Sequence, residues 1–303
     1  MTEQHTPAEG FRILAIHAHP DDESSKGAGT MIKYVSEGAR VLVATCTGGE
    51  QGSVLNPKVA DVPMAARDLA GMRIGEMAEA ARHLGVEHRW IGFADSGLPE
   101  GDPLPALPYG SFATLSLEHA SAPLIRLARS FKPHVILAYD ENGGYPHPDH
   151  IMSHRVAMEV YEKAGDPDAY PGLGEPWTPS KLYYDKGFNT DKLKALHEAV
   201  LSDGRESPYA DFLKRIEDRP NADGWILYDT TTQIDVGPYI ERREEALKSH
   251  RTQIDPDSMF FAVPAERQRE VWPWEDYVLA KSRVESELPE TDLLAGLRDG
   301  GEA

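Results

Sequence analysis

Two short apolar runs, each ended by a cluster of histidines and aspartates, limit most strongly what this chain can fold into. Residues 13–16 read Ile-Leu-Ala-Ile and lead into His-Ala-His-Pro-Asp-Asp-Glu, and the run 134–140 leads to Gly-Gly-Tyr-Pro-His-Pro-Asp-His at residues 143–150. A helical pattern follows each cluster, and an apolar run that feeds a helix is typical of a buried parallel strand. Ligands of open α/β sheets lie at the carboxyl ends of such strands, so we expect both clusters at one functional edge.

Strand and helix patterns alternate along the first half of the chain. We expect further strands at 41–47 and 89–93 and helices at 24–37, 65–84, 115–131 and 150–163, with Pro123 as a candidate break in the third helix. This alternation predicts an α/β fold with a doubly wound, mostly parallel sheet.

The length of 303 residues suits one large domain with three sections. We expect residues 1–164 to form a metal-binding catalytic core, and residues 165–284 to form a C-terminal α+β elaboration that completes the pocket in the same structural domain. Strand patterns occur in that elaboration at 182–188 and 225–236, and helical patterns at 190–201, 210–216 and 239–250. Residues 285–303 are an acidic tail whose composition predicts partial disorder.

The two clusters contain a ligand set for one metal ion. His19, Asp22 and His150 can supply two imidazoles and one carboxylate, which leaves a coordination position open for water, as in catalytic zinc sites. Zn²⁺ is the expected ion, although Fe(II) uses the same set. Asp21 neighbours a ligand but can point elsewhere in an irregular loop, so we expect it to act as the general base toward the water.

Three further residues of the second cluster suit the same chemistry. His147 could stabilise the oxyanion or act as the acid, and Tyr145 could donate a second hydrogen bond to that oxygen. Asp149 is a natural acceptor for a ligand imidazole. His154 and His250 are left out of the metal set, because a histidine on a helix face or at a helix C-terminus is usually a supporting or surface group.

Composition narrows the classes of partner. A formal net charge of −19 repels phosphate backbones and anionic lipids, so we expect a neutral or cationic small molecule and neither nucleic acid nor a membrane. No apolar stretch reaches the ~18 residues of a membrane span. The single cysteine, Cys46, lies in the apolar run 41–47, which excludes a disulfide framework and indicates a reducing, cytoplasmic setting.

The motif Ala18-His-Pro-Asp-Asp-Glu23 together with His147-Pro-Asp-His150 resembles the signature of the PIG-L/LmbE family of metal-dependent N-deacetylases. The resemblance implies a Rossmann-like α/β fold and removal of acyl groups from N-acyl glucosamine conjugates. It implies the roles given above: His19, Asp22 and His150 as metal ligands, Asp21 as general base and His147 as electrostatic partner.

Further blocks resemble one branch of that family. They are His19-Pro-Asp-Asp-Glu-Ser-Ser-Lys-Gly27, Thr47-Gly-Gly-Glu50, Asp95-Ser-Gly-Leu98, Tyr139-Asp-Glu-Asn-Gly-Gly-Tyr-Pro-His147, Gly174-Glu-Pro-Trp177, Ser180-Lys-Leu-Tyr-Tyr184 and Thr252-Gln-Ile-Asp-Pro256. This branch hydrolyses the amide between an S-conjugated N-acetylcysteine and glucosaminyl-inositol, a pseudo-disaccharide thiol conjugate, in thiol-based detoxification. The resemblance makes Lys26, Glu50, Arg73 and Asp95 candidates for contacts to the sugar and the inositol.

Three other functions stay open at this point. The near alternative is a deacetylase acting on N-acetylglucosaminyl-inositol, which shares the chemistry but needs a smaller acyl pocket. A non-catalytic sugar-binding module is the alternative from a different class. A dinucleotide oxidoreductase is disfavoured, because Gly27 and Gly29 are followed by Ile32 where the third glycine of the fingerprint would stand. The sequence does not fix the oligomeric state.

Overall fold

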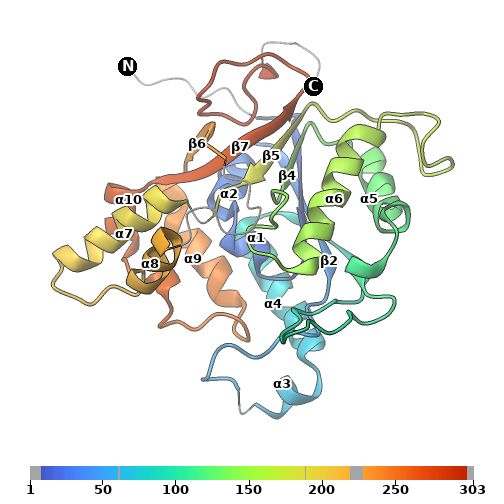
Figure 1. Ribbon diagram of the computed structural model, residues 1–303. Coiled ribbons are helices and arrows are strands. Elements are labelled where there is room, and N and C mark those ends of the chain that lie inside the picture. The colour runs from blue at the N-terminus through green and yellow to red at the C-terminus, as the bar shows by residue number, and fades with distance from the viewer. Residues whose placement is uncertain (1–7, 61, 188, 219–227, 299–303) are drawn as a thin grey trace.

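Strand β1 (Arg12–His17) lies inside a seven-stranded sheet, between β2 (Arg40–Thr47) and β4 (Val135–Ala138). The computed structural model describes residues 8–60, 62–187, 189–218 and 228–298, and within them the strand order is β3-β2-β1-β4-β5-β7-β6 (Figure 1). The remaining strands are β3 (Glu87–Phe93), β5 (Lys181–Asp185), β6 (Thr232–Asp235) and β7 (Trp274–Ser282). All pairings from β3 to β5 are parallel, and β7 is antiparallel to both of its neighbours. The predicted α/β fold with a mostly parallel sheet is confirmed.

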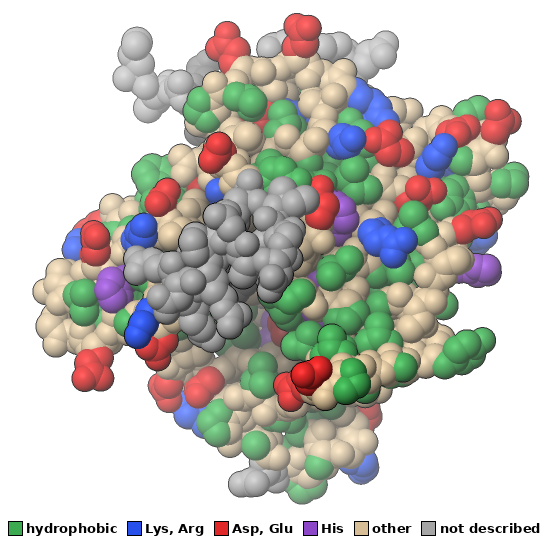
Figure 2. All heavy atoms as spheres, viewed as in Figure 1, with side chains coloured by type: hydrophobic (Ala, Val, Ile, Leu, Met, Phe, Trp, Pro, Cys, Tyr) green, Lys and Arg blue, Asp and Glu red, His purple; other side chains and the backbone are tan. Residues whose placement is uncertain are grey.

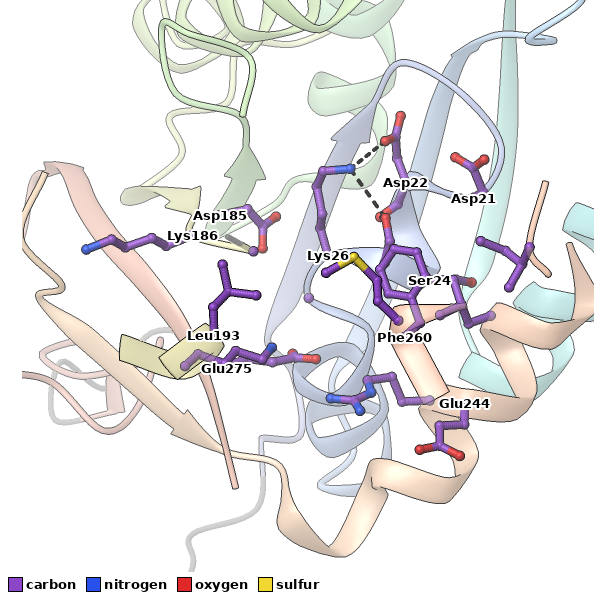
Figure 3. Close-up of a pocket in the computed structure, with 18 of the residues that line it drawn as sticks. Asp21, Asp22, Ser24, Lys26, Asp185, Lys186, Leu193, Glu244, Phe260 and Glu275 are labelled. Atoms are coloured by element: carbon purple, nitrogen blue, oxygen red, sulfur yellow. Dashed lines mark hydrogen bonds and ion pairs between the residues drawn. The ribbon is translucent and has the colours of Figure 1, made fainter. Parts of the chain in front are cut away.

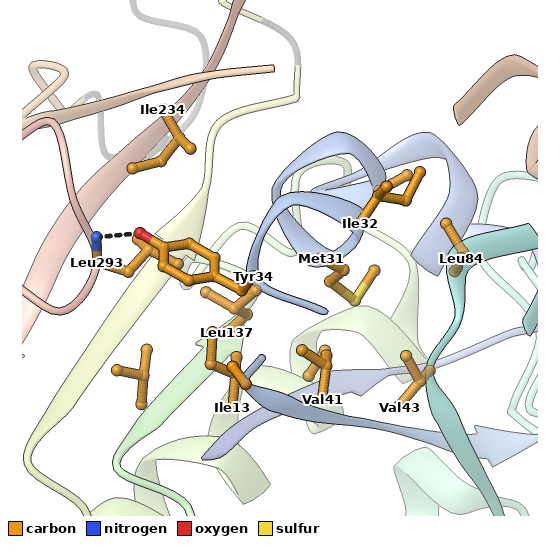
Figure 4. Close-up of a cluster of buried hydrophobic side chains, with 14 of the residues drawn as sticks. Ile13, Met31, Ile32, Tyr34, Val41, Val43, Leu84, Leu137, Ile234 and Leu293 are labelled. Carbon is orange, nitrogen blue, oxygen red and sulfur yellow. Dashed lines mark hydrogen bonds between the residues drawn. The ribbon is translucent and has the colours of Figure 1, made fainter. Parts of the chain in front are cut away.

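Helices cover both faces of the sheet, which explains why β1 is apolar at consecutive positions. Ile13 and Ala15 enter one buried cluster, and Leu14 and Ile16 enter the cluster on the opposite face. The first cluster contains Met31, Ile32, Tyr34 and Leu84 from helices α2 (Ala28–Ser36) and α4 (Leu69–Leu84) (Figure 4). The second contains Leu124, Ile125, Val156 and Val160 from α5 (Leu117–Phe131) and α6 (Pro148–Lys163). A strand buried on both faces needs no alternation of apolar and polar residues.

The helices of the first half begin and end close to the predicted positions, with two breaks that the patterns missed. The structure has α1 (Asp22–Ser25), α2 (Ala28–Ser36), α3 (Pro63–Arg67), α4 (Leu69–Leu84), the 3-10 helix η1 (Phe112–Thr114), α5 (Leu117–Phe131) and α6 (Pro148–Lys163). Gly27 separates α1 from α2 at φ +74°, and a Cβ there would lie 3.0 Å from the Tyr277 hydroxyl. Asp68 separates α3 from α4 and accepts a hydrogen bond from the Gly71 N–H. Pro123 does not break α5.

The C-terminal half extends the same sheet. It contributes α7 (Thr190–Ser202), α8 (Ala210–Asp218), η3 (Gly237–Tyr239), α9 (Ile240–Ser249), η4 (Met259–Phe261) and α10 (Ala265–Val271), with α7 and α8 packed into a third buried cluster. Strand β7 lies between β5 and β6 and was not predicted. The predicted strand at 225–236 is found only at β6, and its first residues, 225–227, lie outside the described part of the chain.

The part of the acidic tail that the structure describes, residues 285–298, contacts the rest of the domain. Leu293 and Leu294 are fully buried, and Glu290 accepts hydrogen bonds from Lys181 Nζ at 2.5 Å and the Tyr183 hydroxyl at 2.6 Å. Two leucines and a paired glutamate thus anchor residues 285–298 to the domain. Residues 299–303 lie outside the described part.

The distribution of charged side chains on the surface agrees with the net charge of −19. Figure 2 shows acidic side chains spread over this face, with basic ones interspersed rather than gathered into a stripe. Among the described residues, no helix combines the length and the apolar character that crossing a membrane would require.

Candidate metal and catalytic site

The adjacency of β1 and β4 brings the two histidine and aspartate clusters together. The strands pair in parallel, with Ile13 opposite Val135 and Ala15 opposite Leu137, so their carboxyl ends meet at one edge. His19 lies in the loop after β1, Asp22 opens α1, and His150 stands in the first turn of α6. All three side chains are buried.

Their ligand atoms form a compact triangle. His19 Nδ1 and His150 Nε2 are 3.3 Å apart, and Asp22 Oδ2 lies 3.4 Å from His150 Nε2 and 3.6 Å from His19 Nδ1. Two ligands bound tetrahedrally to Zn²⁺ at ~2.1 Å would be about 3.4 Å apart. The donor set and its spacing therefore fit one zinc ion, and the predicted convergence of these residues is present in the structure.

Hydrogen bonds leave the correct ring nitrogen of each histidine free. His150 Nδ1 donates to the Gly143 carbonyl at 2.8 Å, which directs the lone pair of Nε2 at the triangle. His19 Nε2 lies 3.4 Å from Asp149 Oδ2 and 3.5 Å from Asp95 Oδ1, which directs Nδ1 at the same point. A carboxylate on the far nitrogen of a ligand histidine is the usual support in metal sites. Asp149 thus stands where the sequence predicted it.

The protonation of the ligand groups also suits a metal. Burial lowers the pKa of His150 to about 3, so this imidazole is neutral. Burial acts to raise the pKa of Asp22, but Lys26, His150 and His19 hold it well below its usual value. Burial acts to lower the pKa of His19, and its hydrogen bonds to Asp149, Asp22 and Asp95 raise it well above the ordinary value. Binding of a metal ion to His19 would compete with protonation of this imidazole.

Asp21 is not part of the triangle, and its carboxylate pairs with Arg73 instead. Its backbone has φ +114°, a conformation that residues with a side chain rarely adopt. Its carboxylate accepts a hydrogen bond from Arg73 Nη2 at 3.1 Å, and burial raises its pKa. The side chain remains about one quarter exposed and lines the adjoining pocket.

His147 and Tyr145 lie beside the triangle. His147 Nδ1 accepts the Asp149 N–H at 3.1 Å, so the proton of the neutral ring is on Nε2. Burial and the neighbouring His19 lower the pKa of His147, which favours a neutral hydrogen-bond donor over an imidazolium. The Tyr145 ring centroid is 4.6 Å from that of His150, and its side chain is partly exposed.

The four predicted substrate contacts do not share one environment. Lys26 lines the pocket and bonds Asp22 Oδ1 at 2.6 Å. Arg73 is instead buried, with its guanidinium bound to the Gly49 and Pro20 carbonyls and to Asp21. Asp95 is buried beside His19, and the Glu50 carboxylate accepts the Asp95 N–H at 2.8 Å. Arg73 and Asp95 thus support the site from within, whereas the Glu50 residue is exposed.

A pocket of about 270 Å³ opens from Asp21, Asp22 and Tyr145 toward α7, α9 and η4 (Figure 3). Its charged wall includes Asp185, whose pKa burial raises to about 8. Leucines of α7 and α9 and Phe260 supply apolar surface. The pocket therefore combines hydrogen-bonding groups with apolar contact, as ligand sites do.

The sequence reading missed a buried pair behind the site. His250, expected as a surface or capping group, is fully buried and bonds Glu23 Oε1 at 2.7 Å. Only the side-by-side placement of α1 and the end of α9 reveals this contact. His154 lies outside the triangle, and its Nδ1 donates to the Tyr139 carbonyl.

Comparison with known proteins shows that this chain is similar to amidases and deacetylases. The model of the family described as PIG-L, GlcNAc-PI de-N-acetylase, matches residues 14–161. A protein of Streptomyces coelicolor named mycothiol S-conjugate amidase is 53% identical, over 95% of this chain and 98% of its own length. A 1D-myo-inositol 2-acetamido-2-deoxy-alpha-D-glucopyranoside deacetylase of Geodermatophilus obscurus is 39% identical, over 94% and 98%. The structure of N,N'-diacetylchitobiose deacetylase from Pyrococcus horikoshii shares the fold, with a TM-score of 0.60, 19% identity and coverage of 91% and 86%.

Proposed function

We propose that this chain, which belongs to the PIG-L family, is a metal-dependent amidase that hydrolyses the amide bond of mycothiol S-conjugates. The products would be an N-acetylcysteine S-conjugate, a mercapturic acid, and glucosaminyl-inositol. The observation that carries the proposal is the 53% identity to an amidase of that name over nearly the full length of both chains. The triangle of His19, Asp22 and His150 supports it, because it supplies the donor set of a catalytic metal site.

Each residue of the site has a separate role in the proposed amide hydrolysis. A bound Zn²⁺ supplies the Lewis acid, polarising the amide carbonyl and lowering the pKa of water from about 15.7 toward 7. Asp21 accepts the proton of the attacking water and delivers it to the leaving glucosamine nitrogen, and its raised pKa suits both steps. The His147 Nε2–H and the Tyr145 hydroxyl donate to the carbonyl oxygen as it becomes negative.

The pocket suits the sugar part of such a substrate. The hydroxyl groups of glucosamine and inositol both donate and accept hydrogen bonds, and Lys26, Asp185 and Lys192 line the pocket with both kinds of partner. A small polyol conjugate is thus the partner we propose. We also propose that the protein acts in a reducing cytoplasm, where the buried Cys46 stays a thiol. Burial raises the Cys46 pKa to about 12, which speaks against a role as nucleophile.

Metal identity is tested by elemental analysis of protein purified without added ions. We expect about one zinc per chain, with loss of hydrolysis after chelation and recovery on adding Zn²⁺. Recovery with Fe(II) under anaerobic conditions and not with Zn²⁺ would assign the site to iron, which uses the same ligand set.

The second candidate is the N-acetylglucosaminyl-inositol deacetylase, which the relatives at 36–39% identity favour. Turnover of a bimane conjugate of mycothiol, measured beside turnover of N-acetylglucosaminyl-inositol, separates the two. A higher kcat/KM for the conjugate is expected, and a wide preference for the acetylated sugar would overturn the proposal. A non-catalytic sugar-binding module predicts that Asp21→Asn changes nothing, whereas the amidase loses turnover and keeps its metal.

A further inference from the structure

A buried ion pair connects the first helix to the end of α9 directly behind Asp21. Glu23 Oε1 accepts from His250 Nε2 at 2.7 Å and from the Ser24 hydroxyl at 2.5 Å. Glu23 Oε2 accepts the backbone N–H of Asp21 at 2.9 Å. The side chains of Glu23 and His250 are both fully buried, although their residues are 227 positions apart.

Burial of this ion pair costs free energy. Removing two charges from water costs several kcal/mol per ion, and replacing a buried pair by apolar residues is often neutral or stabilising. Stability alone therefore does not account for a pair at this place. Its contact to the backbone of Asp21 suggests another reason.

Asp21 holds a backbone conformation that needs support. A residue with a side chain at φ +114° carries a strain of about 1–3 kcal/mol, which persists only where neighbours fix it. Glu23 fixes the Asp21 N–H, and Arg73 fixes its carboxylate. The Asp21 side chain lines the pocket together with that of Asp22, and Figure 3 labels both residues there.

The segment that carries His250 is itself anchored to the helix that carries Arg73. The Thr252 N–H and hydroxyl donate to the two carboxylate oxygens of Glu76 on α4, at 3.0 Å and 2.7 Å. Glu76 lies three residues, about one turn, after Arg73. Arg73 stands on α4, and Glu23 is bonded to His250 in a segment that is itself bonded to α4, so both supports of Asp21 are connected to that helix.

We propose that Glu23 and His250 are positioning residues, which hold the Asp21 backbone so that its carboxylate faces the reacting water. This inference rests on the proposed role of Asp21 in amide hydrolysis. It assigns a use to the glutamate that ends the first motif and to the histidine that precedes Thr252-Gln-Ile-Asp-Pro256, neither of which holds the metal.

The test compares Glu23→Gln and His250→Ala with the wild type, as full-length, zinc-loaded protein. We expect kcat to fall at least tenfold while KM for the bimane conjugate and the zinc content change less than twofold. His250→Gln keeps an N–H donor for Glu23 and should recover part of kcat. In an Asp21→Asn background, His250→Ala should cause no further loss of kcat, because the pair acts through Asp21.

The matched control is His134→Ala. His134 is also a buried histidine, but it accepts the Arg12 N–H at the amino ends of β1 and β4, at the opposite edge of the sheet. Its variant should keep the wild-type kcat below its unfolding temperature.

Three results would overturn the inference: wild-type kcat in His250→Ala, loss of zinc in proportion to loss of kcat, or a further fall of kcat in the Asp21→Asn background. Absence of hydrolysis in the wild type would instead reject the proposed function. A crystal structure of His250→Ala gives a readout independent of activity, in which the Asp21 carboxylate should leave its place beside Arg73.

Discussion

Replacing Asp149 by asparagine should weaken zinc binding while every proposed ligand stays in place. Asp149 is fully buried, and its Oδ2 lies 3.4 Å from His19 Nε2 and 2.9 Å from the Ser96 N–H. Asparagine keeps the shape and one acceptor oxygen but removes the charge that makes the His19 ring a stronger donor. Loss of such a support usually lowers metal affinity 10–100-fold, or about 1.4–2.7 kcal/mol.

For Asp149→Asn alone, we expect the loss of zinc affinity to be at the lower end of that range. Asp95 Oδ1 lies 3.5 Å from the same nitrogen of His19, so it can take over the hydrogen bond when the Asp149 charge is lost. We therefore expect Kd for Zn²⁺ to rise about tenfold in Asp149→Asn and about a hundredfold when Asp95→Asn is added.

Zinc affinity would be measured by titrating the metal-free protein against a competing chromophoric chelator. Glu290→Gln is the control, because it removes a buried carboxylate at the opposite end of β5 and should leave Kd unchanged. The reasoning is refuted if the double variant binds zinc as tightly as the wild type, since His19 would then need no carboxylate to orient it.

Two further predictions concern stability. Glu290→Gln leaves the Lys181 ammonium buried without its anion. The free energy of unfolding, measured by urea titration, should therefore fall by about 3–5 kcal/mol while kcat stays unchanged. A loss below about 1 kcal/mol would show that the tail is not anchored as described. Burial and the nearby Glu275 raise the pKa of Asp185 to about 8 from an ordinary 3.8, so the folded state holds this proton more tightly and stability falls as pH rises between about 4 and 8. Asp185→Asn should therefore gain stability relative to wild type at pH 8.5 compared with pH 4, and an equal difference at both values would contradict the shift.

The patterns near the N-terminus predicted where His19, Asp21 and Asp22 lie, because the relevant structure there is local. Four consecutive apolar residues can form β1 only if both faces are covered, and the polar cluster after them then falls at a ligand-binding edge. That His19 and His150 meet depends on β4 being the neighbour of β1. Periodicity alone does not give strand order, and the prediction relied on the chemical match between the two clusters.

Strand β7 escaped prediction for a physical reason. Its residues Glu275 and Asp276 are buried, whereas charged residues in a sequence usually mark an exposed position. Glu275 is buried because its carboxylate accepts the Gly29 and Thr30 N–H groups at the start of α2, from 2.8 to 2.9 Å. A carboxylate at a helix N-terminus satisfies free donors there, and only the tertiary structure shows which helix it serves.

The balance of charge around His19 gives a physical reason for a divalent cation at this site. Asp22, Asp95 and Asp149 are all buried and all lie within 3.6 Å of its imidazole, which can carry one positive charge at most. Lys26 compensates Asp22 from the pocket side at 2.6 Å, so the group retains a net negative charge in an environment that solvates charge poorly. A dication held by His19, Asp22 and His150 would offset that excess. The same excess would oppose a phosphate at this edge, which separates the site from the nucleotide-binding edges of other α/β sheets.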